Sequence, residues 1–348
     1  MACIQIVNKK IGRDCPPFVI AEAGINHNGN LDIAFEMIRV AKRSGADAIK
    51  FQTFKAEEFI SDPAQTYTYK SQGIEITESM LEMFKRYEFS HDQWRSIKSK
   101  CDQEEIMFLS TPQNVSDLTL LLEIEIPMIK VGSDDFTNIP LLKNYAKTGL
   151  PLLLSCGMAD FAEVFNGLEA VGAFDGYPVI LLLCTSQYPT PPDDVNLRKL
   201  TSLIGAFPMI SVGFSDHTQG PLASVMALAL GASVFEKHFT LDHNMSGPDH
   251  WFSADPDELT TWVDFLRDGY LMLGDGIVRP TPTERSNKKE FQRVIVARQE
   301  IKNGDIYTED NLTLLRVKGG KGMSPAILKL LLGQKAHKSY RSGEAIEL

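Results

Sequence analysis

The chain has 348 residues, of which 43% are hydrophobic, so we expect one large folded core with room for a small second domain rather than a disordered chain. Its formal net charge of −10 argues against nucleic acid or an acidic membrane as a partner, although a local basic pocket can still bind a small anion. No apolar run approaches the roughly 20 residues that span a bilayer, and residues 1–5 lack a signal-peptide pattern, which predicts a cytoplasmic protein.

Short apolar stretches alternate with helical patterns from residue 18 to residue 273. At intervals of about 30 residues, strands are predicted at 18–23, 48–52, 107–112, 124–130, 151–155, 179–184, 209–214 and 233–235. Eight such units favour a (β/α)8 TIM barrel over an open doubly wound sheet. The active site of such a barrel lies at the carboxyl ends of its strands, and each predicted strand is followed by polar residues.

Two segments interrupt or end this alternation of predicted strands and helices. Residues 55–89 form a long polar and aromatic insertion, which we interpret as a functional lid. A Pro- and Thr-rich stretch at 279–283 is typical of an interdomain linker. We therefore predict a barrel over residues 1–278, a linker over 279–292 and a small, mostly β domain over 293–348, which needs to dock on its own barrel or a partner's for sufficient burial.

Lys130 closes a predicted buried strand and is followed by Gly132 and Ser133. A lysine in that position costs desolvation energy unless an anion meets it, and the glycine allows close approach of the backbone. Further cations and hydroxyls at strand ends that suit a phosphate pocket are Lys50, Lys237, Ser155, Ser186 and Ser215. The alternative is that each serine caps the following helix and that Lys130 extends to solvent.

His217 and His238 follow neighbouring predicted strands, so both imidazoles can face one point above the barrel. Two histidines with open positions for water and substrate would suit a divalent metal that acts as a Lewis acid, although structural, hydrogen-bonded histidines are the alternative. Candidate acids for proton transfer or for binding sugar hydroxyls are Glu22, Asp135, Glu236 and Asp249. Each of these acids can instead form an ion pair with a lysine.

Several ordered motifs together resemble one family. They are residues 21–29 (AEAGINHNG), 50–53 (KFQT), 130–133 (KVGS), 188–191 (YPTP), 215–218 (SDHT), 236–239 (EKHF) and 247–249 (GPD). These motifs closely resemble the N-acetylneuraminate (sialic acid) synthase family over nearly the whole chain, including a C-terminal domain similar to its antifreeze-like (SAF) module. The resemblance implies a transferase of EC class 2.5.1 that condenses phosphoenolpyruvate, an N-acylmannosamine-type aldose and water into a nonulosonic acid and phosphate.

The resemblance also implies roles for individual residues. His217 and His238 match the metal ligands, with Mn²⁺ or Mg²⁺ as the cofactor. The positions that match the phosphoenolpyruvate-binding residues are Lys50, Lys130, Ser133, Ser155, Ser186 and Ser215. The sugar-side and proton-transfer positions are Glu22, Gln52, Asp135, Tyr188 and Asp249, and we add Glu236 as a catalytic acid and Thr111 as a substrate-binding residue.

The resemblance leaves alternatives open at two places. The family's swapped homodimer inserts an arginine of the SAF module into the neighbouring active site, and either Arg316 or Lys318 fills that position here. Asp135 and Ser186 stand where bacterial members often have Glu and Asn, as in the animal 9-phosphate-forming branch. The acceptor is therefore N-acetylmannosamine, its 6-phosphate, or the diacetamido sugar that leads to legionaminic acid.

Two other functional classes compete with this interpretation. A barrel metallohydrolase would use the same two histidines, but the first strand offers only His27 and no H-x-H pair. A non-catalytic sugar-binding protein would bind its ligand without Mn²⁺ or Mg²⁺.

Overall fold

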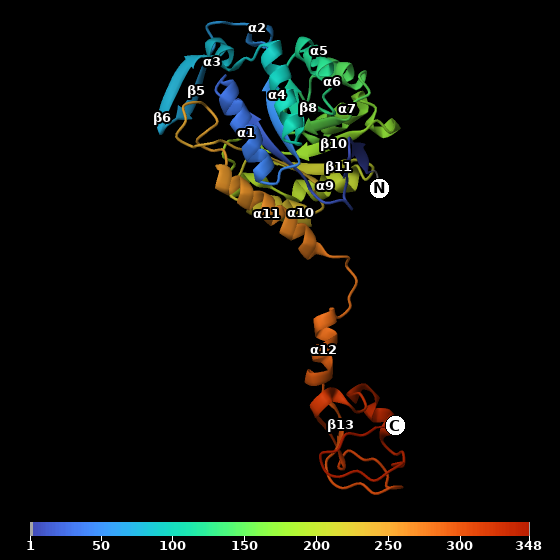
Figure 1. Ribbon diagram of the computed structural model, residues 1–348. Coiled ribbons are helices and arrows are strands. Elements are labelled where there is room, and N and C mark those ends of the chain that lie inside the picture. The colour runs from blue at the N-terminus through green and yellow to red at the C-terminus, as the bar shows by residue number, and fades with distance from the viewer. Residues whose placement is uncertain (1–2, 348) are drawn as a thin grey trace. The chain divides into compact units, whose positions relative to one another are not determined.

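The computed structural model describes residues 3–347, apart from the side chain of Lys289. The chain divides into two compact units, with the division between Gly274 and Asp275 (Figure 1). The predicted linker, residues 279–292, contains helix α12 (Pro282–Phe291). Within the described residues, none of the helices combines the length and the apolarity needed to cross a membrane.

Eight parallel strands of the first unit form a closed barrel, which confirms the predicted fold class. In chain order they are β3 (Phe18–Gly24), β4 (Ala48–Thr53), β7 (Met107–Pro112), β8 (Ile129–Val131), β9 (Leu152–Ser155), β10 (Val179–Leu183), β11 (Ser211–Asp216) and β12 (Val234–His238). The last strand pairs with the first, with His238 opposite Glu22. This pairing closes the sheet and removes both of its edges.

The amino end of the barrel is filled by apolar side chains. Alternate residues of β3 point to opposite faces, so Phe18 and Ile20 enter the interior while Val19 and Ala21 pack under the helices. A short hairpin of β1 (Ile4–Ile6) and β2 (Lys9–Ile11) adds Ile6 and Ile11 to the same interior cluster. Because this end is filled, the carboxyl ends of the strands are left to carry the site.

Helices surround the strands on the outside of the barrel (Figure 1). They are α1 (Leu31–Arg43), α4 (His91–Gln103), α5 (Val115–Glu123), α6 (Ile139–Ala146), α7 (Phe161–Ala170), α8 (Pro192–Val195), α9 (Arg198–Ala206), α10 (Leu222–Ala229) and α11 (Pro256–Leu273), with a 3-10 turn η1 (Ala173–Asp175). Helix α4 begins with a capping box: Gln93 N–H donates to Ser90 Oγ at 3.3 Å, and Ser90 N–H donates to Gln93 Oε1 at 2.8 Å.

The insertion between β4 and β7 has secondary structure of its own. It comprises α2 (Ala56–Phe59), a hairpin of β5 (Thr66–Ser71) and β6 (Ile74–Ser79), and α3 (Met80–Tyr87). At the hairpin tip, Gln72 and Gly73 have φ of 50° and 82°, a conformation that suits a tight two-residue turn. Figure 1 shows the hairpin beside the loop that joins β12 to α11.

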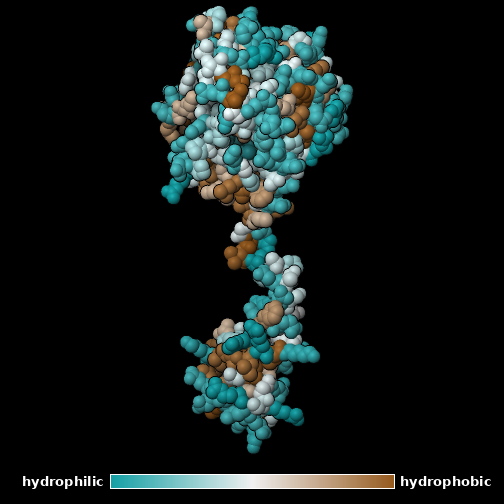
Figure 2. Space-filling view, turned by 90° about the vertical axis from the view of Figure 1, so that its left-hand side faces the viewer, coloured by the Kyte–Doolittle hydropathy of each residue, from teal (hydrophilic) through white to brown (hydrophobic). Residues whose placement is uncertain are grey.

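The second unit has a small core around two antiparallel strands, β13 (Val294–Ala297) and β14 (Leu312–Leu315). Two 3-10 helices, η2 (Lys318–Gly320) and η3 (Pro325–Ile327), and the short helix α13 (Leu328–Leu331) follow β14 in the chain. On the face shown in Figure 2, hydrophobic residues of this unit gather into a patch with hydrophilic residues around it. The docking expected from the sequence stays a prediction.

Candidate active site

One cavity of about 850 Å³ opens at the carboxyl ends of the barrel strands, a size within the usual range for small-molecule sites. It brings together every site residue predicted from the sequence except Asp135, Lys237, Arg316 and Lys318. The predicted residues that line it are Glu22, Lys50, Gln52, Thr111, Lys130, Ser133, Ser155, Ser186, Tyr188, Ser215, His217, Glu236, His238 and Asp249. All eight strands contribute, because each apolar strand ends in polar side chains at the same rim.

Two ammonium groups and two carboxylates share the floor of the cavity. Lys50 Nζ lies 2.7 Å from Glu22 Oε2 and 3.9 Å from Glu236 Oε2. Lys130 Nζ lies 3.9 Å from the other carboxylate oxygen of Glu236. All four side chains are buried, so each charge depends on the others for compensation.

The two carboxylates of the floor differ in acidity. Burial raises the pKa of Glu22 to about 7, although Lys50 opposes the shift. Burial acts on Glu236 in the same direction, but Lys130 and Lys50 outweigh it and lower the pKa of Glu236. Because the pKa values of the two acids are shifted in opposite directions, Glu22 can exchange a proton near neutral pH while Glu236 stays ionised.

Lys130 shares one corner of the cavity with Ser133, Ser155 and Ser186, and these groups are donors of the kind that suits an anion. Lys130 Nζ donates to Ser155 Oγ at 2.7 Å, and burial together with Lys50 lowers the pKa of Lys130. The backbone N–H of Gly157 donates to Ser133 Oγ at 3.1 Å. A Cβ at Gly157 would lie 2.6 Å from Ser186 Oγ and 2.7 Å from Ser133 Oγ, so only glycine fits between these hydroxyls.

His217 and His238 meet at the rim with ring centroids 5.6 Å apart. His217 Nδ1 lies 2.7 Å from the carbonyl oxygen of Thr185, an acceptor, which leaves the lone pair on Nε2. His238 Nδ1 is buried without a hydrogen-bond partner among the described residues. Burial lowers the pKa of His217 and holds that of His238 well below its ordinary value, so both rings are neutral at pH 7. His217 Nε2 also lies 3.3 Å from Ser215 Oγ, which donates to Glu236 Oε1 at 2.9 Å. Two neutral imidazoles that line one cavity fit a divalent metal.

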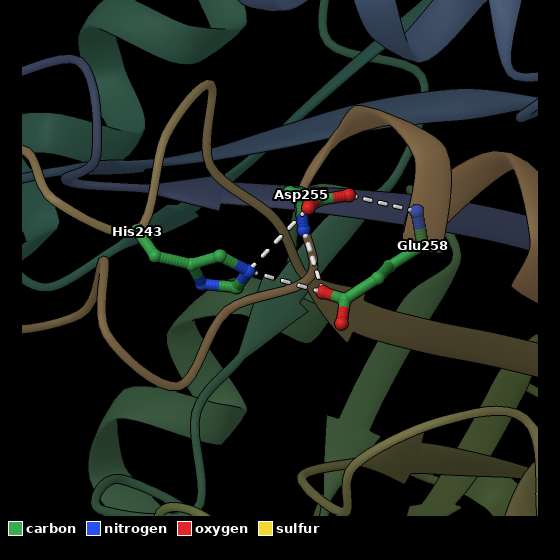
Figure 3. A group of neighbouring side chains, drawn as sticks. All are labelled: His243, Asp255 and Glu258. Atoms are coloured by element: carbon green, nitrogen blue, oxygen red, sulfur yellow. Dashed lines mark hydrogen bonds and ion pairs between the residues drawn. The ribbon is translucent and has the colours of Figure 1, made fainter.

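A different group of potential metal ligands lies at the start of α11 (Figure 3). His243 Nε2 lies 3.6 Å from Asp255 Oδ2 and 3.3 Å from Glu258 Oε2. Within residues 3–347, this is the one group of three His, Cys, Asp or Glu side chains close enough to hold an ion. Both carboxylates already cap α11, since each accepts a backbone N–H of the other residue, and none of the three residues lines the cavity.

Asp135, Lys237, Arg316 and Lys318 are the predicted site residues outside the cavity lining. Lys237 Nζ instead lies 3.3 Å from Asp216 Oδ2. Asn138 Nδ2 donates to Asp135 Oδ1 at 3.0 Å, while Asp134 lines the cavity in its place. Arg316 belongs to the second unit, where its guanidinium lies 5.8 Å from the ring centroid of Phe291. The roles that the sequence predicts for Asp135 and Arg316 stay predictions.

Some lining residues were missed by the sequence analysis. Cys184 lies with its Sγ 3.0 Å from Ser133 Oγ, and its position directly after a predicted strand was the available signal. The aromatic residues Trp251 and Phe252 come shortly after the Gly-Pro-Asp motif. The ring centroids of Phe252 and Tyr188 lie 5.1 Å apart. Tyr67 and Tyr69 of the β5–β6 hairpin also line the cavity, and only the aromatic content of the insertion pointed to them.

The chain matches a known protein family over each of two separate ranges. Residues 37–278 match the NeuB family and residues 292–347 match the SAF domain. The chain is 40% identical to the N,N'-diacetyllegionaminic acid synthase of Campylobacter jejuni, over 94% of this chain and 98% of that protein. It is 36% identical to the N-acetylneuraminate-9-phosphate synthase of Homo sapiens, over 93% of this chain and 90% of that protein.

The fold has a solved counterpart as well. The crystal structure of N-acetylneuraminic acid (sialic acid) synthetase from Leptospira borgpetersenii, in complex with citrate, covers 82% of this chain and 95% of its own. That structure has a TM-score of 0.73 and 33% sequence identity to this chain. With its barrel matched over most of its length and its relatives named as sialic-type acid synthases, the chain belongs to the NeuB family and ends in a SAF domain.

Proposed function

We propose that this enzyme condenses phosphoenolpyruvate, an N-acylmannosamine-type aldose and water into a nonulosonic acid and phosphate. The observation that carries the proposal is the cavity floor, where two buried ammonium groups lie beside a carboxyl whose pKa burial raises to about 7. The names of the relatives, which are legionaminic acid and N-acetylneuraminate-9-phosphate synthases, support the same reaction.

The anionic substrate fits the Lys130 corner. Phosphoenolpyruvate carries a phosphate and a carboxylate, and charge-assisted hydrogen bonds from lysine and hydroxyl groups bind such anions strongly. Lys130, Ser133 and Ser155 supply these groups at the ends of neighbouring strands. Lys50 lies on the opposite side of Glu236 and supplies a second cation to the same anion.

The carbon–carbon bond forms between C3 of phosphoenolpyruvate and the aldehyde carbon of the acceptor. The aldehyde oxygen takes a proton as it becomes a hydroxyl, and Glu22 is the group whose acidity suits that transfer. Water then adds at C2, and the bond between C2 and the phosphate oxygen breaks, which releases phosphate. Lys50 and Lys130 bind the departing phosphate.

His217 and His238 would hold a divalent ion, Mn²⁺ or Mg²⁺ in our proposal, since both rings are neutral and line the same cavity. When bound, such an ion supplies Lewis-acid polarisation of the acceptor carbonyl. Gln52, Thr111, Tyr188 and Asp249 contribute the sugar side of the cavity. We further propose a cytoplasmic homodimer in which Arg316 or Lys318 completes the partner's site.

Release of inorganic phosphate tests the proposal. Purified chain with Mn²⁺ should release phosphate only when phosphoenolpyruvate and an acceptor sugar are both present. Release from phosphoenolpyruvate alone would contradict the condensation and indicate a phosphatase.

The competing classes have weaker support in the structure. His27 is buried, stacks on Phe89 at a centroid distance of 4.3 Å and does not line the cavity, so a hydrolase would lack its ligand from the first strand. A protein that only binds neutral sugars has no need for two buried lysines beside two acids, which cost desolvation energy.

A further inference from the structure

Two cysteines lie side by side at the amino end of the barrel. Cys3 directly precedes β1, and Cys15 lies between β2 and β3. Their sulfur atoms are 3.2 Å apart. A disulfide bond needs about 2.05 Å, so a small movement of either side chain is enough to form one. Neither residue lines the cavity, so the pair has no part in the proposed reaction.

The local fold brings the two sulfur atoms together. Strands β1 and β2, which we call the N-terminal hairpin, pair antiparallel, and the open end of the pair lies next to Cys3. The chain then turns back after β2, since Cys15 N–H donates to the carbonyl oxygen of Gly12 at 3.0 Å, as in a four-residue turn. This turn returns Cys15 to the open end of the hairpin.

The N-terminal hairpin packs beneath the floor of the cavity. Ile6 and Ile11 are buried in the cluster that fills the barrel interior, together with Phe18 and Ile20. Ile20 lies two residues before Glu22 on β3 and therefore on the same face of that strand, so the cluster lies directly under the charged floor. A bond that fixes the hairpin also fixes the apolar packing under the floor.

The two thiols differ in their access to solvent. Cys3 is exposed, whereas Cys15 is half-buried. Burial, together with the hydrogen bond to Cys3, raises the pKa of Cys15 to about 11, so Cys15 keeps its proton at neutral pH. An oxidant from solvent therefore meets Cys3 first. The other cysteines of the chain are buried: Cys101, Cys156 and Cys184.

We infer that Cys3 and Cys15 form a reversible oxidation site, and that the disulfide between them closes the open end of the N-terminal hairpin when peroxide is present. The O–O bond of hydrogen peroxide breaks, one oxygen bonds to Cys3 Sγ as a sulfenic acid, and the other leaves with the thiol proton as water. Cys15 Sγ then bonds to Cys3 Sγ, the S–O bond breaks, and the hydroxyl leaves with the Cys15 proton as a second water. The two thiols lose two electrons in total, and the peroxide gains them. A dithiol reductant restores both thiols by exchange.

Peptide mapping of the full chain tests the inference. The protein is treated with hydrogen peroxide, its remaining thiols are blocked, and it is digested with trypsin without reduction. Trypsin cleaves after Lys9 and Arg13, which puts Cys3 and Cys15 on separate peptides that only a disulfide joins. We expect a joined pair that is lighter than the two free peptides by two hydrogen atoms and that dithiothreitol separates. Cys101 is the internal control and should be recovered as a blocked thiol.

Two variants test the order of the steps. In Cys15→Ser the sulfenic acid at Cys3 has no partner, so dimedone should trap it, while Cys3→Ser should give neither the adduct nor the disulfide. Peroxide should raise the Tm of the unmodified barrel by about 5 °C or more, because the closed hairpin loses freedom in the unfolded chain, and should not raise the Tm of either variant.

Three results would overturn the inference. They are recovery of Cys3 and Cys15 as blocked thiols after peroxide, a disulfide that joins two chains, and an unchanged Tm once the disulfide has formed. These measurements do not depend on phosphate release, so their failure and a failure of the proposed function are distinguishable.

Discussion

Lys50 Nζ lies 2.7 Å from Glu22 Oε2 at the floor of the cavity, with 3% and 1% of their side chains exposed. Neither charge is solvated, so the pair is stable only as a unit with Glu236 and Lys130 beside it. Burial nevertheless raises the pKa of Glu22 to about 7, which makes its proton available under physiological conditions. Under the proposed function, this contact would put a cation beside phosphoenolpyruvate and an acid beside the acceptor sugar.

The first prediction concerns Glu22. Glu22→Gln keeps the shape of the side chain but removes the exchangeable proton, so kcat should fall by about 10² to 10⁴-fold while binding of phosphoenolpyruvate persists. Steady-state kinetics and titration with phosphoenolpyruvate measure the two effects separately. The matched control is Asp117→Asn, because Asp117 is a buried carboxyl with a pKa raised by burial to about 6 that lies outside the cavity. An equal fall in kcat in the two variants would show that Glu22 does not transfer the proton.

The second prediction concerns the Lys130 corner. Ser155→Ala removes the hydroxyl that Lys130 Nζ contacts at 2.7 Å, so KM for phosphoenolpyruvate should rise by about tenfold, the value of one charge-assisted hydrogen bond. Ser110→Ala is the control, since Ser110 is a buried serine of β7, the strand that pairs with β8 on the side away from β9. Ser110 Oγ lies 2.7 Å from Thr53 Oγ1, and Ser110 does not line the cavity. The control should lower stability without changing KM. An unchanged KM in Ser155→Ala would show that phosphoenolpyruvate does not occupy this corner.

The third prediction separates the two groups of possible metal ligands. Metal-free chain should bind Mn²⁺ in equilibrium dialysis, and His217→Ala and His238→Ala should each weaken that binding strongly. His243→Ala should leave the binding intact, because the carboxylates beside His243 are already used to cap α11. If only the His243 variant lost Mn²⁺ binding, the metal site would lie at the start of α11 and not at His217 and His238.

The fourth prediction concerns Asp249, a half-buried residue that lines the cavity. Within residues 3–347, its carboxylate has no hydrogen-bond or ion-pair partner, and burial raises its pKa from 3.8 to about 7. The folded state then holds this proton more tightly than the unfolded state, so its contribution to stability decreases as pH rises from about 4 to 7. Asp249→Asn removes the ionisable group and should stabilise the chain at pH 8 relative to the unmodified protein.

Thermal unfolding at two pH values measures the effect of Asp249→Asn. The gain in unfolding free energy should be larger at pH 8 than at pH 4, with an upper bound of about 4 kcal/mol because one pKa unit corresponds to about 1.36 kcal/mol. The variant should also lose affinity for the acceptor sugar. A gain of the same size at both pH values would mean that the ionised carboxylate is solvated.

The sequence was sufficient to predict the barrel and most of its rim. Each strand has an apolar run followed by polar residues, and closure of the sheet brings those ends together without further information. Strand bounds were less accurate. The predicted strand at 124–130 is reduced to Ile129–Val131, because Ile124 ends α5 and Glu125 adopts a φ of 58°.

Side-chain direction after short strands could not be predicted from sequence. Asp134 and Asp135 are adjacent carboxylates, and the turn after β8 decides which one faces the cavity. Gly132 permits the observed arrangement, since a Cβ there would lie 2.1 Å from Asp134 Oδ1. The apolar side chains of the insertion that line the cavity were missed for another reason. They come from α2, α3 and the residue after β4, and only the folded insertion brings them together: Phe54, Phe59, Met80, Met83 and Phe84.

The most direct test of the proposed function uses phosphoenolpyruvate with ¹⁸O in the oxygen that bridges C2 and phosphorus. Incubated with Mn²⁺ and the preferred acceptor, the chain should yield labelled phosphate and an unlabelled acid whose mass equals acceptor plus pyruvate. Label retained in pyruvate, with no new acid, would show cleavage of the phosphorus–oxygen bond and would contradict the proposed condensation.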